Sequence, residues 1–251
     1  MVGMSMLTVL FALLGLAFGS FGNVLILRIR KAEVLSGRSA CPHCRTPIAW
    51  YDLVPVLSFV LLRGRCRTCE SRISFQYPLV ETGSVLLFVA AMSLASGDPV
   101  RAFGIAFALY FLFLACVYDG MYQQIPDLFT ALFSVAALID VVMSNADVVS
   151  HVEGALVPLL WFGLQWVVSR GRAVGSGDIL LGSAIGLWLG LFNAGVMLVL
   201  SYMIGAIVVV FLLLVKKIPK KRERIAFGPF MGIATILTLL GAGDLYLSLL
   251  K

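Results

Sequence analysis

Two short stretches of the sequence place aspartates beside long apolar runs: VYDGMYQQIPD at residues 117–127 and GSGDILLGSAIG at residues 175–186. A carboxylate at the centre of a membrane helix costs about 2.5–3.5 kcal/mol on insertion scales, so acidic residues beside such runs are candidates for function. If a helix bundle brings Asp119 and Asp178 together, they cannot both ionise. One carboxylate could then take a proton from water while its protonated partner polarises a carbonyl group, which is aspartic protease chemistry.

The residues around these aspartates have supporting interpretations. Gly175 and Gly177 would allow the backbone turn that leads into a helix at Asp178, and would let a substrate strand approach closely. Plain helix packing is the alternative reading of this glycine-rich segment. Asp127 follows Pro126 and suits the first turn of a helix, where an acidic group interacts favourably with the helix dipole. We interpret Asp127 as a supporting residue.

The second group of chemically active residues comprises four of the five cysteines, arranged as CPHC (Cys41, Cys44) and CRTC (Cys66, Cys69). Two C-x-x-C knuckles at this spacing suit tetrahedral zinc coordination by four thiolates. Such a closed site would be structural, and His43 inside the first knuckle is not expected to be a ligand. The alternative is a set of redox-active or idle thiols. Disulfides are disfavoured on a reducing cytoplasmic face.

The composition restricts the kind of scaffold that can carry these residues. Apolar residues make up 61% of the 251 residues, and charged residues make up 13%. Ordinary soluble domains have about 45–50% apolar residues with glycine included, and about 25% charged residues. So apolar a chain cannot cover itself with polar side chains. This excludes a soluble enzyme, a disordered chain and a disulfide-stapled secreted domain, and it indicates a polytopic membrane protein.

The apolar runs predict the number of membrane helices, since a helix needs about 20 mostly apolar residues to cross the hydrocarbon core. The candidate spans are residues 4–27, 79–97, 101–118, 127–144, 152–169, 178–192, 194–215 and 226–249. We therefore predict an all-α bundle of about eight transmembrane helices. Its expected parts are a first helix (1–29), a small zinc-binding loop domain with four cysteines (30–78) and a membrane peptidase core (79–251).

The basic residues predict the orientation of the chain, because cytoplasmic loops carry an excess of Lys and Arg. All basic residues except Arg101 and Lys251 fall on one side of the predicted spans. Both termini should then lie outside, with the cysteine loop, Asp119 and Asp178 at the cytoplasmic face. The net charge of +6 reflects this bias, with some attraction to lipid headgroups. We predict no nucleic-acid partner.

An ordered series of motifs resembles one known family. The chain resembles the bacterial type IV prepilin peptidases, the bifunctional leader peptidases and N-methyltransferases of pilus and type II secretion systems. The motifs are GSFGNVLILRIR (19–30), CPHC (41–44), IAWYDLVPVLSFVLLRGRCRTC (48–69), ISFQYPLVE (73–81), YDGMYQQIPD (118–127), GSGDILLGSAIGLWLG (175–190) and FGPF (227–230). The likeness covers most of the chain, and the order of the motifs makes it far more specific than any single one.

The resemblance implies that Asp119 and Asp178 are the catalytic pair and that the cysteine loop binds zinc. It implies substrates of the prepilin or pseudopilin class, cut after a glycine at the cytoplasmic face of the bacterial inner membrane. It also implies methylation of the new N-terminus from S-adenosylmethionine, for which no binding residues can be named. One departure is Gly120, where many members of the family carry an apolar residue.

One alternative to this interpretation is a non-catalytic membrane scaffold with a zinc loop, in which the aspartates would be incidental. Two further alternatives are active proteins. A presenilin-like or signal-peptide-peptidase-like intramembrane protease shares the YD and GxGD motifs, but such enzymes act within the span. A proton-coupled transporter would carry acidic residues near the middle of broken helices. Placement of both aspartates at helix ends, beside a cysteine loop, favours the prepilin peptidase interpretation over both.

Overall fold

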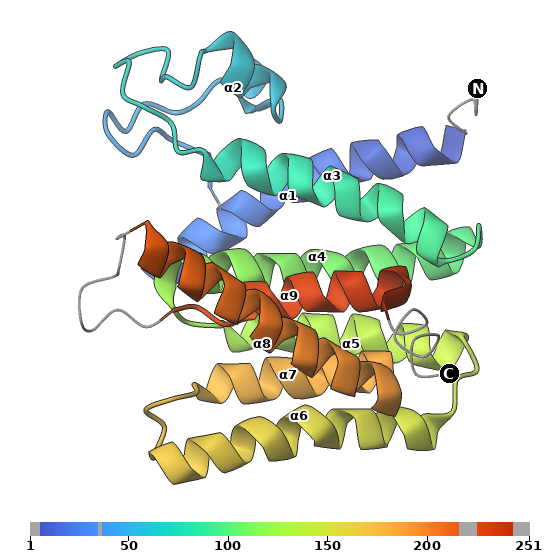
Figure 1. Ribbon diagram of the computed structural model, residues 1–251. Coiled ribbons are helices and arrows are strands. Elements are labelled where there is room, and N and C mark those ends of the chain that lie inside the picture. The colour runs from blue at the N-terminus through green and yellow to red at the C-terminus, as the bar shows by residue number, and fades with distance from the viewer. Residues whose placement is uncertain (1–5, 35–36, 216–224, 243–251) are drawn as a thin grey trace. The chain divides into compact units, whose positions relative to one another are not determined.

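The computed structural model describes residues 6–34, 37–215 and 225–242. These residues form helices, turns and two isolated β-bridges, and no strand is found among them (Figure 1). The chain divides into two compact units, one that ends at Ser93 and one that begins at Leu94. The basic loop at 216–224 and the end of the last predicted span lie outside the described residues.

The first unit is a pair of apolar helices with the cysteine loop between them. Helix α1 spans Met6–Lys31 and α3 spans Gln76–Leu94, and between them lie the short 3-10 helix η1 (Trp50–Leu53) and α2 (Leu57–Leu61). The rings of Phe18 and Phe88 stack between the two long helices at 5.7 Å. The Asn23 side-chain amide donates to the carbonyl oxygen of Tyr77 over 3.1 Å and so ties α1 to the start of α3.

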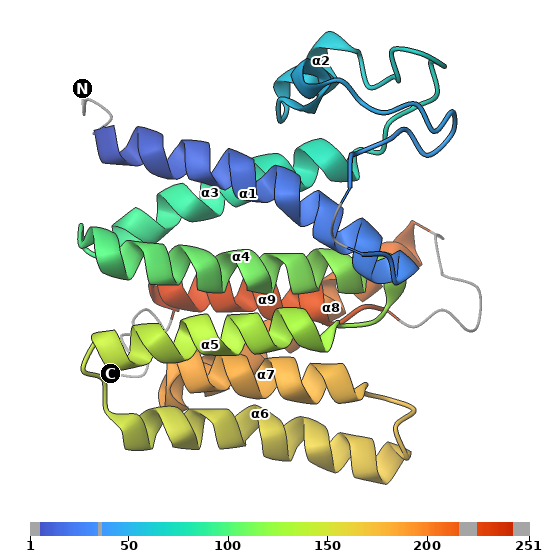
Figure 2. The same ribbon diagram turned by 180° about the vertical axis from the view of Figure 1, so that it is seen from behind.

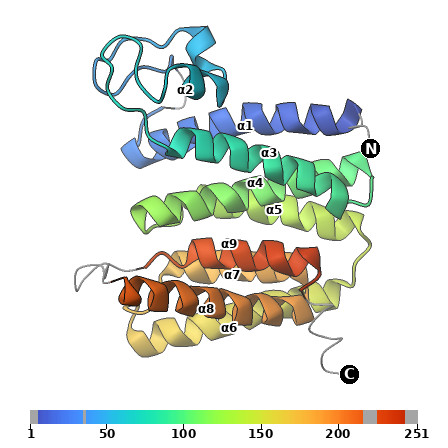
Figure 3. The same ribbon diagram turned by 45° about the horizontal axis from the view of Figure 1, so that its top comes forward.

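The second unit is a bundle of six helices. They are α4 (Pro99–Tyr122), α5 (Asp127–Met143), α6 (Val148–Ser169), α7 (Ser176–Leu189), α8 (Leu191–Leu214) and α9 (Gly228–Leu237), with a π-helical turn at Thr238–Ala242. Helices α4, α5, α7 and α6 lie side by side in that order (Figure 2). Helix α9 packs on α4 and α8, and α8 packs on α6 (Figure 3).

Capping residues explain where several of these helices begin. Asp98 precedes α4 and accepts the backbone N–H groups of Val100 and Arg101, with Pro99 at the first helical position. Asp147 caps α6 in the same way by accepting the N–H of Val149. Both follow the usual preference for an acidic or hydroxyl N-cap. Helices α7 and α8 are separated by Gly190, whose φ of +78° interrupts the helix.

The structure confirms an all-α membrane protein. Helices α1, α3, α4, α6 and α8 are long and apolar enough to cross a membrane by length and composition. Helix α5 has 17 residues, and the apolar helices α7 and α9 are shorter than a full span. Each of the eight predicted spans overlaps a helix of the described residues, but only the five long helices reach the length of a full span, and the last predicted span (226–249) is described only to Ala242.

The closest helix contact of the second unit joins α6 and α7. A Cβ added at Gly186 would overlap the carbonyl oxygen of Gly154, so the two backbones are in direct contact there. The glycines at 182 and 186 face Pro158 and Phe162 of α6. This is the close packing that small residues on one helix face permit, and it sets the position of the helix that carries Asp178.

Candidate active site

Asp119 lies in the last turn of α4, and only 5% of its surface is exposed. Its Oδ2 accepts the backbone N–H of Gly228 over 2.9 Å. Gly228 is the first residue of α9, and N–H groups in the first turn of a helix have no partner within that helix. The carboxylate of Asp119 therefore caps α9 from a residue 109 positions away.

The contact between α4 and α9 requires a residue without a side chain at position 228. A Cβ there would lie 2.8 Å from Asp119 Oδ2, closer than real Cβ contacts allow. One turn earlier in α4, the Cys116 thiol donates to the carbonyl oxygen of Gly228 over 3.2 Å. Cys116, the fifth cysteine of the chain, thus helps hold the first turn of α9 against Asp119.

The sequence analysis assigned no role to FGPF (227–230), and this is the functional element it missed. The motif begins α9 and supplies the N–H group that binds Asp119. The signal that could have found it is a glycine directly before a proline at the start of an apolar helix, since proline is typical of the first helical turn.

Asp178 is the third residue of α7 and is half-buried. Its Oδ2 accepts the N–H of Gly175, the N-cap of the same helix, over 3.0 Å. Gly175 has φ −81° and ψ 155°, which any residue adopts. Its contribution is therefore the N–H group and the free space beside the carboxylate, since an added Cβ would lie 3.3 Å from Asp178 Oδ2.

Helix α4 ends and helix α7 begins at the same end of the second unit, so the bounds of the two helices put Asp119 and Asp178 at that end (Figure 1). Ile125, in the connection between α4 and α5, packs against Gly177, where an added Cβ would lie 3.1 Å from the Ile125 Cβ. Gly177 thus allows the start of α7 to approach the end of α4.

Asp127, predicted as a supporting residue, is exposed at the first residue of α5, with Pro126 as the N-cap. This is the first-turn position that the sequence analysis expected. A carboxylate there interacts favourably with the helix dipole.

The four loop cysteines form a cluster in the first unit. The sulfur atoms of Cys41, Cys44, Cys66 and Cys69 all lie within 4.8 Å of one another, and those of Cys41 and Cys69 are 3.8 Å apart. Four sulfurs about 2.3 Å from a tetrahedral zinc ion are separated by about 3.8 Å. The donor set and spacing therefore fit a metal ion held by four thiolates, and His43 is exposed.

The two knuckles share one backbone conformation. In each, the N–H of the first cysteine donates to the carbonyl oxygen five residues later, that of Thr46 or Ser71. The residue after the second cysteine, Arg45 or Glu70, has φ near +57°, at 58° and 56° respectively. The chain thus builds the same turn twice, and each turn presents two sulfur atoms.

Local hydrogen bonds favour the thiolate form of Cys41. The backbone N–H of Cys44, with that of His43, lowers the pKa of the Cys41 thiol to about 6. Arg67, between the cysteines of the second knuckle, forms a bidentate ion pair with Asp52 at 2.9 and 2.7 Å and lowers the pKa of that carboxyl. The ion pair ties η1 to the second knuckle.

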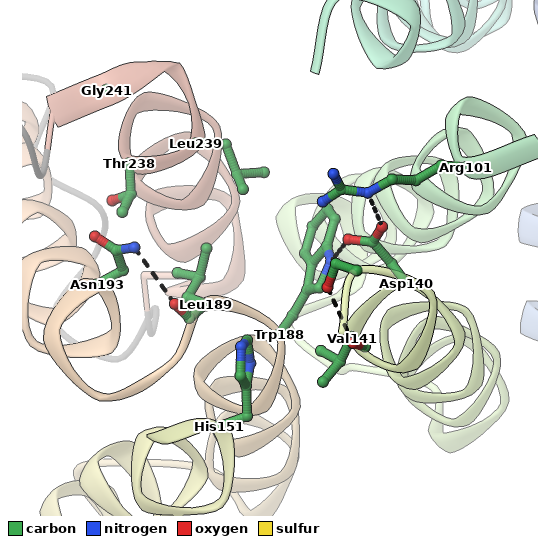
Figure 4. Close-up of a pocket in the computed structure, with 11 residues that line it drawn as sticks. Arg101, Asp140, Val141, His151, Trp188, Leu189, Asn193, Thr238, Leu239 and Gly241 are labelled. Carbon is green, nitrogen blue, oxygen red and sulfur yellow. Dashed lines mark hydrogen bonds and ion pairs between the residues drawn. The ribbon is translucent and has the colours of Figure 1, made fainter. Parts of the chain in front are cut away.

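The second unit contains a cavity of about 310 Å³, whose lining includes Arg101, Asp140 and Trp188 (Figure 4). Asp140 is buried there. It accepts hydrogen bonds from Arg101 Nε at 2.8 Å and Trp188 Nε1 at 2.9 Å. The 18 residues of α4 from Arg101 to Asp119 span about 27 Å, so the cavity is separate from the two aspartates.

Comparison with known proteins assigns the family. Residues 13–94 match the bacterial peptidase A24 N-terminal domain, and residues 106–210 match the type IV leader peptidase family. A prepilin leader peptidase/N-methyltransferase of Klebsiella pneumoniae is 38% identical over 189 residues, which cover 70% of this chain and 82% of the relative. The chain belongs to the type IV leader peptidase family. It is therefore a membrane-bound peptidase.

Other leader peptidases are similar over more of the chain. The protein with the same description from Bacillus subtilis is 31% identical over 240 residues, or 94% of both chains. That from Vibrio cholerae is 33% identical over 213 residues, or 79% of this chain and 84% of the relative. No solved structure matches the chain. Family membership disfavours the presenilin-like protease and the transporter.

Proposed function

We propose that this chain removes the short basic leader of prepilins or pseudopilins, with Asp119 and Asp178 as the catalytic pair. The observation that carries the proposal is the placement of both carboxylates at one end of the second unit. Each accepts a backbone N–H at the start of an apolar helix, over 2.9 and 3.0 Å. Names of the relatives, which include prepilin leader peptidase, support the choice of substrate.

The chemistry follows from two acids that share a proton. The ionised carboxylate removes a proton from water, and the resulting hydroxide attacks the carbonyl carbon of the leader glycine. The protonated carboxyl polarises the carbonyl oxygen and stabilises the tetrahedral intermediate. The C–N bond then breaks, and the new amine takes up a proton from the pair. Gly228 and Gly175 hold the two carboxylates in place through their N–H groups.

We also propose that the aspartates and the cysteine loop face the cytoplasm and that the four thiolates bind a structural zinc ion. The excess of basic residues in the loops on this side of the predicted spans supports the cytoplasmic placement. The spacing of the four sulfur atoms supports zinc. The names of the relatives include N-methyltransferase. S-adenosylmethionine would supply an electrophilic methyl group for the new N-terminus, and no residue is assigned to its binding.

Co-expression with a prepilin tests the proposed activity. The chain and a prepilin should be produced together in a bacterial strain that lacks its own leader peptidase, and the intact pilin mass should be measured. We expect a pilin shortened by its leader, with a cut after glycine and one added methyl group. A pilin that keeps its full leader would contradict the proposed function. A pilin that is cut but not methylated would contradict only the methyl-transfer proposal.

A further inference from the structure

The loop of the first unit contains one strongly apolar segment, LVPVLSFVLL at residues 53–62. Part of it forms α2, and three of its side chains remain on the surface. Leu57 is 54% exposed, Val60 63% and Leu61 71%. Residues spaced by three and four lie on the same face of a helix. Helix α2 therefore presents a small apolar face that the described chain leaves uncovered.

One hydrogen bond fixes the depth of α2 relative to the apolar helix α3. The backbone N–H of Val56 donates to Glu81 Oε2 over 2.6 Å. Glu81 is buried and is the sixth residue of α3, so it lies about 7–8 Å along the helix axis from Gln76. Figures 1 and 2 both show α2 alongside the N-terminal part of α3 rather than beyond its end.

This depth places α2 next to lipid. Helix α3 is long and apolar enough to span a membrane. A segment beside its second turn lies at the boundary between headgroups and acyl chains, since the polar interface extends only a few ångströms on each side of the hydrocarbon core. Apolar faces at that boundary are buried in the interface. A leaflet whose boundary lies at this level of α3 would cover the exposed face of α2.

The charges that follow α2 fit the same position. Arg63 and Arg65 come directly after it and are exposed. Long basic side chains near the interface extend toward the headgroups, and basic clusters there are attracted to anionic lipids. Of the acidic side chains near α2, Asp52 of the loop pairs with Arg67 and Glu81 of α3 accepts the N–H of Val56, while Glu70 lies exposed in the second knuckle.

We propose that α2 is a lipid-inserted segment. Leu57, Val60 and Leu61 contact acyl chains of the leaflet at the N-terminal end of α3, while Arg63 and Arg65 bind anionic headgroups. Glu81 anchors the segment at this depth through the N–H of Val56. The four-cysteine loop is then held on the membrane surface at three points: the ends of α1 and α3, and the inserted α2. This inference does not depend on the proposed peptidase activity.

Depth measurement by electron paramagnetic resonance tests the proposal on the full chain in nanodiscs of phosphatidylethanolamine and phosphatidylglycerol. A genetically encoded spin-labelled residue at position 61 avoids labelling the native cysteines. Matched labels at Leu86, 70% exposed on α3, and at Thr68, exposed in the second knuckle, serve as lipid and water references. Collision rates with oxygen report lipid exposure, and those with a nickel chelate report water exposure.

We expect the label at position 61 to resemble that at position 86, with frequent oxygen collisions and few nickel collisions. Nickel accessibility equal to that at position 68 would show that α2 is in water and would overturn the proposal. Protection from both reagents would show that protein covers α2, as in contact with a second copy or a peptide, and would overturn it as well.

Two variants test the anchor and the charges. Glu81→Ala removes the acceptor for Val56 and should raise nickel accessibility at position 61 several-fold, whereas Glu81→Gln keeps an acceptor oxygen and should preserve the depth. The Arg63→Gln, Arg65→Gln double variant should make α2 shallower in anionic nanodiscs and leave it unchanged in phosphatidylcholine. An unchanged depth in Glu81→Ala would contradict the anchor, and an unchanged depth in the double variant would contradict headgroup binding. A label at position 86 that stays lipid-exposed shows that α3 remains inserted.

Discussion

Each of the two aspartates proposed as catalytic depends on a single backbone N–H group for its position. Asp119 uses that of Gly228 and Asp178 that of Gly175. Both donors lie where a helix begins, and a negative charge is favourable there because the helix dipole is positive at that end. Residues that carry no functional group thus determine where the carboxylates point.

Replacement of Gly228 by alanine should impair catalysis without unfolding the protein. The added Cβ would lie 2.8 Å from Asp119 Oδ2, so either the carboxylate or the start of α9 must move. We expect kcat/KM for prepilin cleavage to fall by about 10- to 100-fold, which corresponds to about 1.4–2.7 kcal/mol of transition-state stabilisation. A continuous cleavage assay on the purified enzyme measures this change.

Gly104→Ala is the matched control for this variant. It makes the same substitution in α4 of the same unit, where an added Cβ meets nothing within 4 Å. Its activity should equal that of the unchanged enzyme. Equal activities for Gly228→Ala and Gly104→Ala would contradict the assigned role of Gly228.

At the scale of structural elements, the two cysteine knuckles are equivalent, so loss of a cysteine from either one should release the zinc ion. Either Cys44→Ser or Cys69→Ser removes one sulfur from a four-sulfur cluster, and three thiolates bind zinc less tightly than four. We expect purified protein with either change to lose most of its bound zinc, as measured by inductively coupled plasma mass spectrometry. Cys116→Ser, which alters a thiol of α4, should retain zinc. Equal zinc content in all three variants would contradict the four-thiolate site.

The contact between α6 and α7 should be sensitive to a single added methyl group. Gly186→Ala places a Cβ against the carbonyl oxygen of Gly154. Overpacking of this kind costs about 1–3 kcal/mol, so the midpoint of thermal unfolding in detergent should fall by several degrees. Gly195→Ala, in an open position of α8, should leave the midpoint unchanged. An equal midpoint for both variants would argue against close backbone contact at Gly186.

Helices were predictable from the sequence, whereas contacts between them were not. Apolar runs of membrane length predict α4 and α6 within a few residues, because one physical requirement sets their length. The same runs contain no information on partners. The hydrogen bond from Gly228 to Asp119 joins residues of separate helices, and no periodicity relates them. In the contact between Val56 and Glu81, Val56 has a left-handed backbone with φ +61°. The sequence does not indicate this conformation, because it is unusual for a residue other than glycine.

The cysteine cluster was predictable because two C-x-x-C knuckles supply four thiolates, which is the number that a tetrahedral zinc site requires. The position of the loop that carries it was not. The sequence analysis treated residues 30–78 as a polar cytoplasmic domain, and the apolar run at 53–62 was used only as part of a resemblance. Its exposed face becomes apparent once Glu81 fixes α2 beside α3.

At the scale of the whole molecule, the proposed orientation in the membrane rests on the distribution of charge. In the first unit, Arg28, Arg30 and Lys31 lie in the last turn of α1. In the second unit, Arg170 is the C-cap of α6, while Asp98 and Asp147 are the N-caps of α4 and α6. Alkaline phosphatase inserted at residues 97 and 145 should be active, because those turns should lie outside the cytoplasm. The same enzyme inserted at residues 123 and 172 should be inactive. An active insertion at residue 123 would contradict the cytoplasmic placement of Asp119.

Asp119 and Asp178 are proposed to cleave the leader together. Replacement of each by asparagine tests this proposal most directly. Asparagine keeps the shape of the side chain and an acceptor oxygen for the N–H of Gly228 or Gly175, but it cannot exchange a proton. The control is Asp147→Asn, the same chemical change at the cap of α6, where asparagine serves equally well.

The measurement is kcat/KM for prepilin cleavage by each purified variant in nanodiscs, with folding checked by the thermal midpoint. We predict that Asp119→Asn and Asp178→Asn each lose about 10²–10⁴-fold, the range attributed to a positioned acid or base, while Asp147→Asn remains fully active. Activity of either site variant close to that of Asp147→Asn would contradict the account.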